Sequence, residues 1–145
     1  MSSIDNEFEF IPVIDTDRLR IVLEHITAHP NLHGQSAWAV RVPSFGVRHC
    51  VAGWTVALDP TYKIDWRVDS LARKTSWAEF AFDIITGDRR HIRSLARDLL
   101  GFTNDQANIF FDVTNSRYRL WGYASTWTDG VIQRPSNVTP SGFRP

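Results

Sequence analysis

The segment His49-Cys50-Val51-Ala52-Gly53-Trp54-Thr55-Val56-Ala57-Leu58 is apolar on nearly every side, and Asp59-Pro60 follows it. A helix that is hydrophobic all round lies in a protein core, so this segment predicts the buried central helix of the fold. Proline cannot continue a helix, so we expect it to end at Asp59-Pro60. A glycine inside a helix costs about 1 kcal/mol relative to alanine. We therefore expect Gly53 to allow the close approach of another element, and Cys50, Gly53 and Trp54 to be structural core residues.

A second helix is predicted on the N-terminal side of this segment, capped by Asp15 or Thr16 and ended by Pro30. Its apolar residues recur at helical spacing: Leu19, Val22, Leu23 and Ile26. Residues 31–48 contain the breakers Pro43 and Gly46, and we expect them to be irregular.

Further along, apolar and charged residues alternate with period two over residues 62–69 and 78–84. This alternation predicts two half-buried strands joined as a β-hairpin through residues 70–75. Three further helices are expected. The first is capped by Asp88 and stopped by Gly101, the second begins at Thr103 with a capping box to Gln106, and the third is capped by Asn115.

The pattern divides the chain into three parts. Residues 1–14 form an acidic N-terminal arm, residues 15–122 a single globular α+β domain, and residues 123–145, rich in proline and glycine, an extended C-terminal tail. The predicted fold is a small helical domain around a buried central helix, with a β-hairpin and extended N- and C-terminal arms.

Composition limits the function. The 145 residues include 16 basic and 16 acidic ones, and a net charge of zero argues against broad electrostatic binding to nucleic acid or membrane. A single cysteine excludes an internal disulfide and a multi-cysteine zinc site. The acidic start is the reverse of a secretory signal, and no apolar run approaches the ~18 residues of a membrane span. We expect a cytoplasmic protein.

Two motifs carry a family resemblance: Cys50-x-Ala52-Gly53-Trp54, and Leu99-Leu100-Gly101-Phe102-Thr103-x-x-Gln106-Ala107-x-x-Phe110-Phe111. Over roughly residues 19–122 the chain resembles small proteins of actinobacteriophages, especially mycobacteriophages, and of actinobacterial genomes. The family pattern has Cys-Gly-Thr where this chain has Phe45-Gly46-Val47, so a function that needs both cysteines is lost here. The resemblance implies a small phage-encoded protein in the host cytoplasm, and it supplies no activity.

Cys50 beside His49 suggests a nucleophile, because a helix N-terminus lowers the pKa of a thiol. Neighbours on a helix point about 100° apart, however, so His49 is a poor base, and we favour a buried, packing role for Cys50. His25, His29 and His33 are spaced by four, and His25 and His29 can share a helix face as zinc ligands do. We favour surface histidines. No phosphate-binding loop is present, and we expect no cofactor or metal.

Two charged groups have a functional and an ordinary interpretation. The acids of the predicted hairpin suggest a glycosidase-like pair, but alternation turns them outward to solvent: Asp65, Asp69, Glu79 and Asp83. The Arg-rich helix at residues 88–100, followed by the Thr103 helix, suggests a helix-turn-helix that binds nucleic acid. Its arginines are Arg89, Arg90, Arg93 and Arg97. The Thr103 helix has no Lys or Arg for phosphate contacts, so this is the alternative function.

Aromatic and arginine residues gather near the end of the predicted domain: Arg117, Arg119, Trp121, Tyr123 and Trp127. These residue types dominate protein-binding hot spots. The alternative is that the tail folds back and these residues cover the edge of the core. The leading hypothesis is a non-enzymatic protein that binds a host or phage protein, or assembles with itself. A cysteine- or metal-dependent enzyme is the third.

Overall fold

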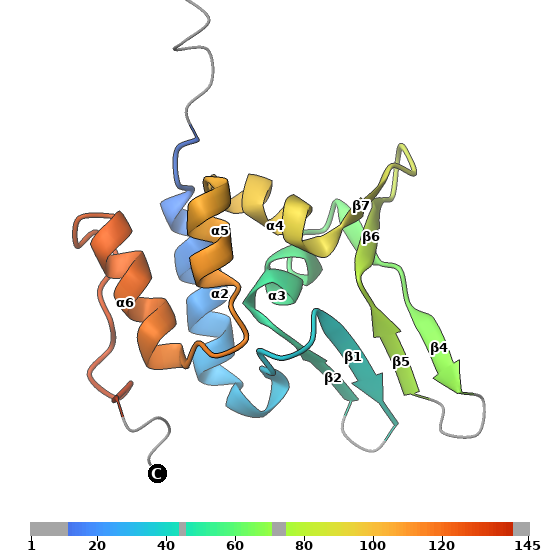
Figure 1. Ribbon diagram of the computed structural model, residues 1–145, viewed down its shortest axis with the longest axis horizontal. Helices are drawn as coiled ribbons and strands as arrows, with labels where there is room; N and C mark the ends of the chain where they lie inside the picture. Colours follow the sequence, from blue (N-terminus) through green and yellow to red (C-terminus); the bar gives the residue numbers. More distant parts are fainter. Residues whose placement is uncertain (1–11, 44–45, 71–74, 141–145) are drawn as a thin grey trace, which may run out of the picture.

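The computed structural model describes residues 12–43, 46–70 and 75–140 (Figure 1). Most of the predicted acidic arm, residues 1–11, therefore lies outside the described residues. The helices are α2 (Thr16–Ala28), the 3₁₀ helix η1 (Pro30–Leu32), α3 (Val51–Ala57), α4 (Ile92–Leu100), α5 (Asn104–Phe110) and α6 (Arg117–Trp127). The strands are β1 (Ala39–Val42), β2 (Gly46–His49), β3 (Tyr62–Ile64), β4 (Arg67–Ser70), β5 (Thr75–Ala78), β6 (Phe80–Asp83) and β7 (Arg89–His91). In the described part of the chain, no helix has the length and apolar character needed to cross a bilayer.

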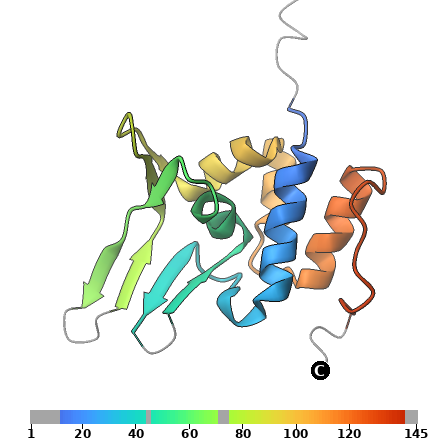
Figure 2. The same cartoon turned by 180° about the vertical axis from the view of Figure 1, so that it is seen from behind.

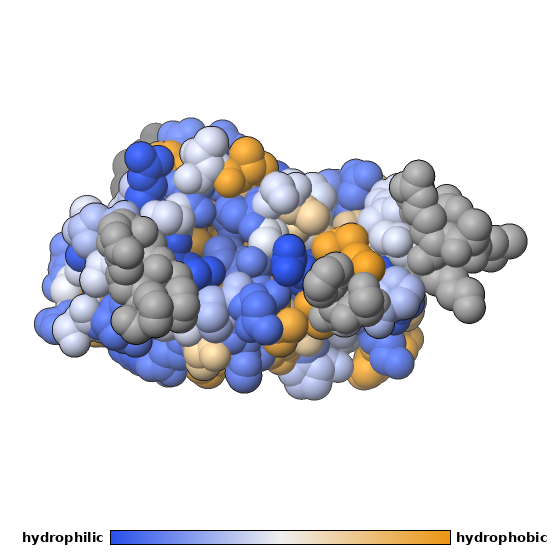
Figure 3. All heavy atoms as spheres, turned by 90° about the horizontal axis from the view of Figure 1, so that it is seen from below, coloured by the Kyte–Doolittle hydropathy of each residue, from blue (hydrophilic) through white to orange (hydrophobic). Residues whose placement is uncertain are grey.

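Helices and strands lie on opposite sides of α3, which confirms the α+β class and the central position of this helix. Figures 1 and 2 show α2, α5 and α6 on one side of α3 and the strands on the other. Residues 51–56 of α3 are all buried, as the apolar character of the segment predicts. On the face shown in Figure 3, apolar residues lie in small separate groups among hydrophilic ones.

The predicted hairpin is present, and it is shared between two antiparallel sheets. Near its turn, β4 pairs with β5 in a sheet of order β2-β1-β5-β4. At its base, β3 pairs with β6 in a sheet of order β3-β6-β7. The ladder is interrupted between the pair Ile64–Ala81 and the pair Arg67–Trp77, and each half of the hairpin extends a different sheet.

The prediction that residues 31–48 are irregular is wrong. They contain η1 and form the hairpin of β1 and β2, in which Ala39 pairs with His49 and Val42 with Gly46. The physical reason lies far along the chain, because β1 also pairs with β5 through residues such as Ala39 and Ala78. The glycine treated as a breaker serves this hairpin, since Gly46 has a φ of 80° where β2 begins.

The predicted helix start at Asp88 is also wrong. Residues 89–91 pair with β6 as strand β7, and His91 caps α4 by accepting a hydrogen bond from the Arg93 amide through Nδ1 (2.9 Å). The later signals are confirmed. Gly101 ends α4 in the left-handed conformation with a φ of 72°, and Thr103 and Gln106 form the capping box of α5.

The last helix begins and ends later than predicted. Ser116 caps α6, because Asn115 instead donates to the carbonyl oxygens of Ile109 and Phe110 (2.6 and 3.0 Å). The helix continues past Gly122 to Trp127, so part of the predicted tail belongs to it. The remaining described tail has little regular structure, but it folds back onto the domain, since Ile132 is 1 % exposed.

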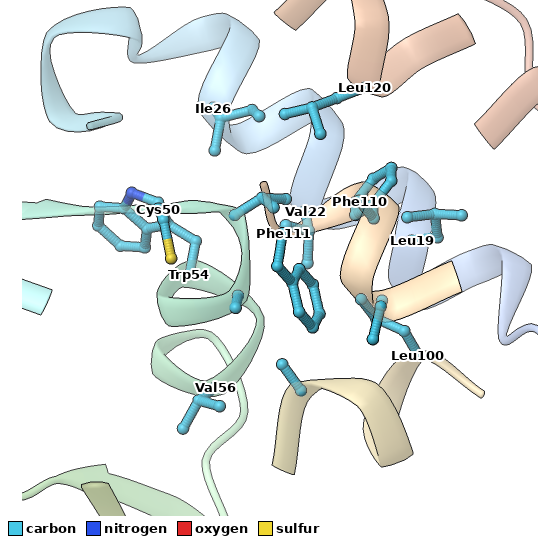
Figure 4. Close-up of a cluster of buried hydrophobic side chains, with 14 of the residues drawn as sticks. Leu19, Val22, Ile26, Cys50, Trp54, Val56, Leu100, Phe110, Phe111 and Leu120 are labelled. Atoms are coloured by element: carbon cyan, nitrogen blue, oxygen red, sulfur yellow. The ribbon is translucent and has the colours of Figure 1, made fainter. Parts of the chain in front are cut away.

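The core joins α2 and α3, the two helices that the sequence predicts most directly. Figure 4 shows Cys50, the N-cap of α3, and Trp54 and Val56 of this helix together with apolar side chains of α2, α4, α5 and α6. Gly53 meets the expectation of a close approach: a β-carbon there would lie 1.9 Å from the carbonyl oxygen of Trp38. The chain before β1 therefore passes directly against the backbone of α3.

Candidate functional site

A groove of about 510 Å³ runs between the outer face of α6 and the C-terminal segment. We call it the α6 groove. Its lining residues are Tyr118, Arg119, Gly122, Tyr123, Ser125, Thr126, Gln133 and Arg134. The lining combines guanidinium, phenol, hydroxyl and amide groups, and none of these residues is acidic.

The amphipathic placement of residues on α6 produces one wall of the groove. Leu120, Trp121 and Ala124 are buried on the inner face. Residues three and four apart share a helix face, so Tyr118, Gly122 and Thr126 lie in a row on the outer side. Gly122 makes room in this row, because a β-carbon there would lie 2.7 Å from Nη2 of Arg134.

The C-terminal segment forms the opposite wall and is held in place by two contacts. Ile132 is buried, and its amide donates to Oγ1 of Thr128 (3.1 Å). Two residues on, the guanidinium of Arg134 lies 3.7 Å above the ring of Tyr118, and its Nε donates to the Tyr118 carbonyl oxygen (3.4 Å). The groove is thus a preformed feature of the fold.

Neither guanidinium of the groove has a carboxylate partner in the described part of the chain, whereas six of the ten other arginines described there form ion pairs with carboxylates. Elsewhere, Arg18 pairs with Asp59 at 2.8 Å, and Arg89 pairs with Asp65 at 2.8 Å. Within the described residues, neither Arg119 nor Arg134 forms an ion pair. The groove therefore carries two positive charges that can bind an acidic ligand, on a chain whose net charge is zero.

Arg119 has one weak electrostatic neighbour. Hydrogen bonds from Thr114 are the main cause of the lowered pKa of Asp112, and the charge of Arg119 adds a smaller contribution. Arg119 is an exposed residue. It remains available to a ligand in the groove.

The structure divides the predicted interaction residues. Arg119 and Tyr123 line the α6 groove. Trp121 is 2 % exposed, and its Nε1 donates to Oγ1 of Thr27 (2.9 Å), so it is a core residue. Arg117 does not line the groove, and its Nη1 lies 3.3 Å from Nδ1 of His33.

Trp127 joins the core and the groove. Its ring lies 5.4 Å from that of Phe102 and 5.8 Å from that of Phe110, and it stacks on Tyr123 at 5.4 Å with an interplanar angle of 17°. Trp121 and Trp127 therefore follow the interpretation in which aromatic residues cover the edge of the core. Tyr123 is held by this stacking while it faces the groove.

Sequence reasoning missed much of the groove. Tyr118 and Gly122 are not among the predicted interaction residues. The other lining residues fall in the predicted C-terminal tail and are not predicted interaction residues either: Ser125, Thr126, Gln133 and Arg134. The signal that locates Tyr118 and Gly122 is their spacing of four on one helix face. No local signal brings Arg134 to Tyr118, because the contact depends on how the tail folds back.

The arginines of the nucleic-acid hypothesis are engaged within the protein. Arg89 pairs with Asp65, and Arg90 with Asp98 at 2.5 Å. On α4, Arg93 donates to Oδ1 of Asn108, and Arg97 donates to Oδ1 of Asn104 (2.6 Å). The last two bonds join α4 to α5 and occupy two of the polar side chains that the second helix would offer to DNA, Asn104 and Asn108. This arrangement weighs against a phosphate-binding surface.

Cys50 is 2 % exposed and caps α3, where its Sγ accepts a hydrogen bond from the Gly53 amide (3.4 Å). Burial raises the pKa of the Cys50 thiol to about 11, the reverse of the activation expected at a helix N-terminus. Burial also lowers the pKa of His49 to about 4, so this neighbour is uncharged at neutral pH. These facts agree with a packing role for Cys50.

The three histidines spaced by four do not meet at one point. The rings of His25 and His29 lie 4.8 Å apart, and His25 contacts Trp54 at 4.4 Å. His33 lies with Gln35 instead, at 2.8 Å between Nε2 and Oε1. Over the described ranges, no group of three or more His, Cys, Asp or Glu side chains is placed to hold a metal ion.

The hairpin acids also have local partners. Asp65 and Glu79 line a second cavity of about 290 Å³ with Trp77, but Asp65 is paired with arginine and Glu79 lies 3.8 Å from Nε2 of His91. Asp83 accepts hydrogen bonds from the turn that follows β6, and these bonds lower its pKa. The side chain of Asp69 lies outside the described residues.

Comparison of the chain with models of protein families, with curated proteins and with solved structures found no match. The function is therefore inferred from the side chains of the site. The α6 groove offers unpaired positive charge, aromatic surface and hydroxyl groups on a fixed frame. That combination suits an acidic peptide segment, because guanidinium groups bind carboxylates with directional hydrogen bonds.

Proposed function

We propose that this protein is a non-enzymatic protein-binding domain that holds an acidic segment of a partner protein in the α6 groove. The observation that carries the proposal is the pair Arg119 and Arg134, both without a carboxylate partner in the described residues and both lining one preformed groove. Arginine and tyrosine are enriched among the residues that contribute most to protein binding. Tyr118 and Tyr123 supply the aromatic part of that surface.

The fixed frame of the groove favours binding. Arg134 is already oriented by Tyr118, and Tyr123 is stacked on Trp127, so little side-chain entropy is lost when a ligand arrives. Ordering a mobile side chain at an interface costs about 0.5–1.5 kcal/mol, which these two residues largely avoid.

The resemblance to small actinobacteriophage proteins supports a host or phage protein as the partner and the host cytoplasm as the place of binding. The zero net charge supports recognition by a local surface rather than by the general field of the protein. The alternative partner is a second copy of the same protein, bound through the same groove.

Capture from a mycobacterial lysate tests the proposal. The wild-type chain is compared with Arg119→Gln/Arg134→Gln and with the control Lys63→Gln/Arg48→Gln, which removes two exposed charges from strands β3 and β2. Wild type and control should retain the same acidic proteins, and the groove variant should retain at least tenfold less, since hot-spot residues each contribute about 2 kcal/mol or more. Equal capture by the groove variant would overturn the proposal.

A further inference from the structure

We propose that the acidic group held by the α6 groove is the phosphoryl group of a phosphorylated side chain in the partner protein. This inference rests on the proposed function, because it names the chemical class of ligand for the same groove. A phosphorylated side chain carries nearly two negative charges and three oxygens that accept hydrogen bonds strongly. A carboxylate carries one charge and two such oxygens. The groove has the charge and the donors for the first of these groups.

The floor of the groove is centred on Gly122. Residues three and four positions apart on a helix are neighbours on one face, with β-carbons about 5–6 Å apart. All four such neighbours of Gly122 in α6 line the groove: Tyr118, Arg119, Ser125 and Thr126. Four side chains that carry a hydroxyl or guanidinium group therefore surround a position that has no side chain.

The second guanidinium reaches the same place from the C-terminal segment. Figures 1 and 2 show this segment running back beside α6, on the side away from α2. Nη2 of Arg134 lies 2.7 Å from the point where a β-carbon on Gly122 would sit. The β-carbon of Arg119 is about 5–6 Å from that point, a distance that its long side chain can cross. Both guanidiniums can therefore contact one small anion.

The charge of the groove matches one dianion. Arg119 and Arg134 form no ion pair with any described residue, and the residues that line the groove include no acid. The carboxylate that interacts electrostatically with Arg119 is Asp112, and it already accepts hydrogen bonds from the amide and hydroxyl of Thr114 (2.8 and 2.5 Å). One phosphomonoester balances both guanidiniums, whereas an acidic peptide has to bring two carboxylates to the same place.

Arg134 is held in a position that leaves its terminal nitrogens for a ligand. Its Nε donates to the carbonyl oxygen of Tyr118 (3.4 Å), and its guanidinium lies over the ring of the same residue. Within the part of the chain that the structure describes, its two terminal nitrogens donate no hydrogen bond. A guanidinium binds phosphate through two parallel N–H groups, and the two terminal nitrogens supply such a pair.

NMR titrations of the full-length, ¹⁵N-labelled protein test this inference with three small probes. Phenyl phosphate represents a phosphorylated side chain, benzoate has the same ring with a carboxylate, and dimethyl phosphate represents the phosphodiester of a nucleic acid. At pH 7.5, phenyl phosphate should shift the amide signals of residues 118–126 and bind about fivefold more tightly than either of the other two, because it engages both guanidiniums. The second pKa of a phosphomonoester is about 6, so its affinity should fall by up to about fourfold between pH 7.5 and pH 5.5. Benzoate stays ionised over this range, and its affinity should not change.

Substitutions locate the anion. Arg119→Gln and Arg134→Gln should each weaken the binding of phenyl phosphate by about tenfold or more, since each removes hydrogen bonds to a charged group. Arg119→Lys keeps the charge without the planar fork and should recover only part of the affinity. Lys63→Gln/Arg48→Gln is the matched control and should leave the affinity unchanged.

Four results would overturn the inference. Benzoate binding as tight as that of phenyl phosphate would show that the groove takes carboxylates, which leaves the proposed function standing. Equally tight binding of dimethyl phosphate would assign the groove to a nucleic-acid backbone. Binding that survives both arginine substitutions would place the anion elsewhere, and the absence of any shift would leave the groove without a phosphoryl ligand. In this last case the lysate capture still decides the proposed function, so the two fail separately.

Discussion

The carbonyl oxygen of Trp38 lies 1.9 Å from the point where a β-carbon on Gly53 would sit. The chain that leads into β1 therefore touches the backbone of the central helix, and only glycine permits this contact. Gly53 is one of six consecutive buried residues of α3, so the contact lies inside the core. It links the β1–β2 hairpin to the helical part of the domain.

Gly53→Ala should destabilise the protein by about 1–3 kcal/mol, as overpacked core substitutions do, despite the better helix propensity of alanine. Gly122→Ala is the matched control, because the new methyl group meets only the flexible end of Arg134. Urea denaturation measures both. A Gly53→Ala variant as stable as Gly122→Ala would contradict the close approach.

Stability should fall on acidification between about pH 6.5 and pH 4. His49 is 2 % exposed, and burial lowers its pKa to about 4 in the folded protein, against about 6.5 when unfolded. Between these two pH values the unfolded chain binds a proton at His49 that the folded chain does not bind. This difference lowers the free energy of unfolding by up to about 3 kcal/mol at the acidic end. The pKa values of His25, His33 and His91 are lowered by burial and act in the same direction.

Urea midpoints measured from pH 7 to pH 4.5 provide the test. His49→Phe keeps an aromatic ring against Trp54 and should make stability much less dependent on pH. The same dependence in His49→Phe as in wild type would show that His49 is not its main source.

Cys50 should be nearly inert towards thiol reagents in the folded protein. Its thiol is 2 % exposed and has a pKa of about 11, so little thiolate is present at pH 8. We expect labelling by Ellman's reagent to be at least a hundredfold slower than in guanidinium chloride. Cys50→Ser retains a capping side chain and should capture the same proteins as wild type. Rapid labelling of the folded chain would reopen the enzymatic hypothesis.

Ile132→Ala should destabilise the domain by about 2–4 kcal/mol, although the residue lies outside every helix and strand. Its side chain is 1 % exposed, whereas that of the adjacent Val131 is 61 % exposed. Val131→Ala should therefore change the free energy of unfolding by less than about 0.5 kcal/mol. Equal effects of the two substitutions would mean that the tail does not pack on the core.

Arg93→Gln/Arg97→Gln should lower stability modestly, by up to about 1 kcal/mol, because both side chains are bonded to α5. It should not alter retention on a DNA column, since we expect wild type itself to bind DNA negligibly at about 50 mM salt. Salt-sensitive DNA binding that this variant loses would favour the nucleic-acid function instead.

The features that the sequence predicted well have local signals. The apolar repeat of α2, the apolar run of α3, the glycine stop of α4 and the capping box of α5 are each contained within about a dozen residues. Hairpin residues 62–83 also follow from a local alternation. These elements were sufficient to place the fold in its class.

The missed features depend on partners that are distant in sequence. Strand β1 needs β5, and β7 needs β6, so propensity alone assigned the first segment to loop and the second to helix. Only the part of the groove that lies on one helix was predicted, for the same reason. Arg119 and Tyr123 are near one another on a helix, but Arg134 reaches Tyr118 only because the chain reverses after Trp127.

The hydrogen bond from Trp121 to Thr27, which joins α6 to α2, also has a consequence during synthesis. The apolar face of α2 leaves the ribosome about a hundred residues before α6 and Ile132, which belong to the same core. At roughly 5–20 residues per second, the nascent chain presents this face for about 5–20 s before the domain can close. During that interval we expect ribosome-associated chaperones to bind the exposed apolar face of the nascent chain.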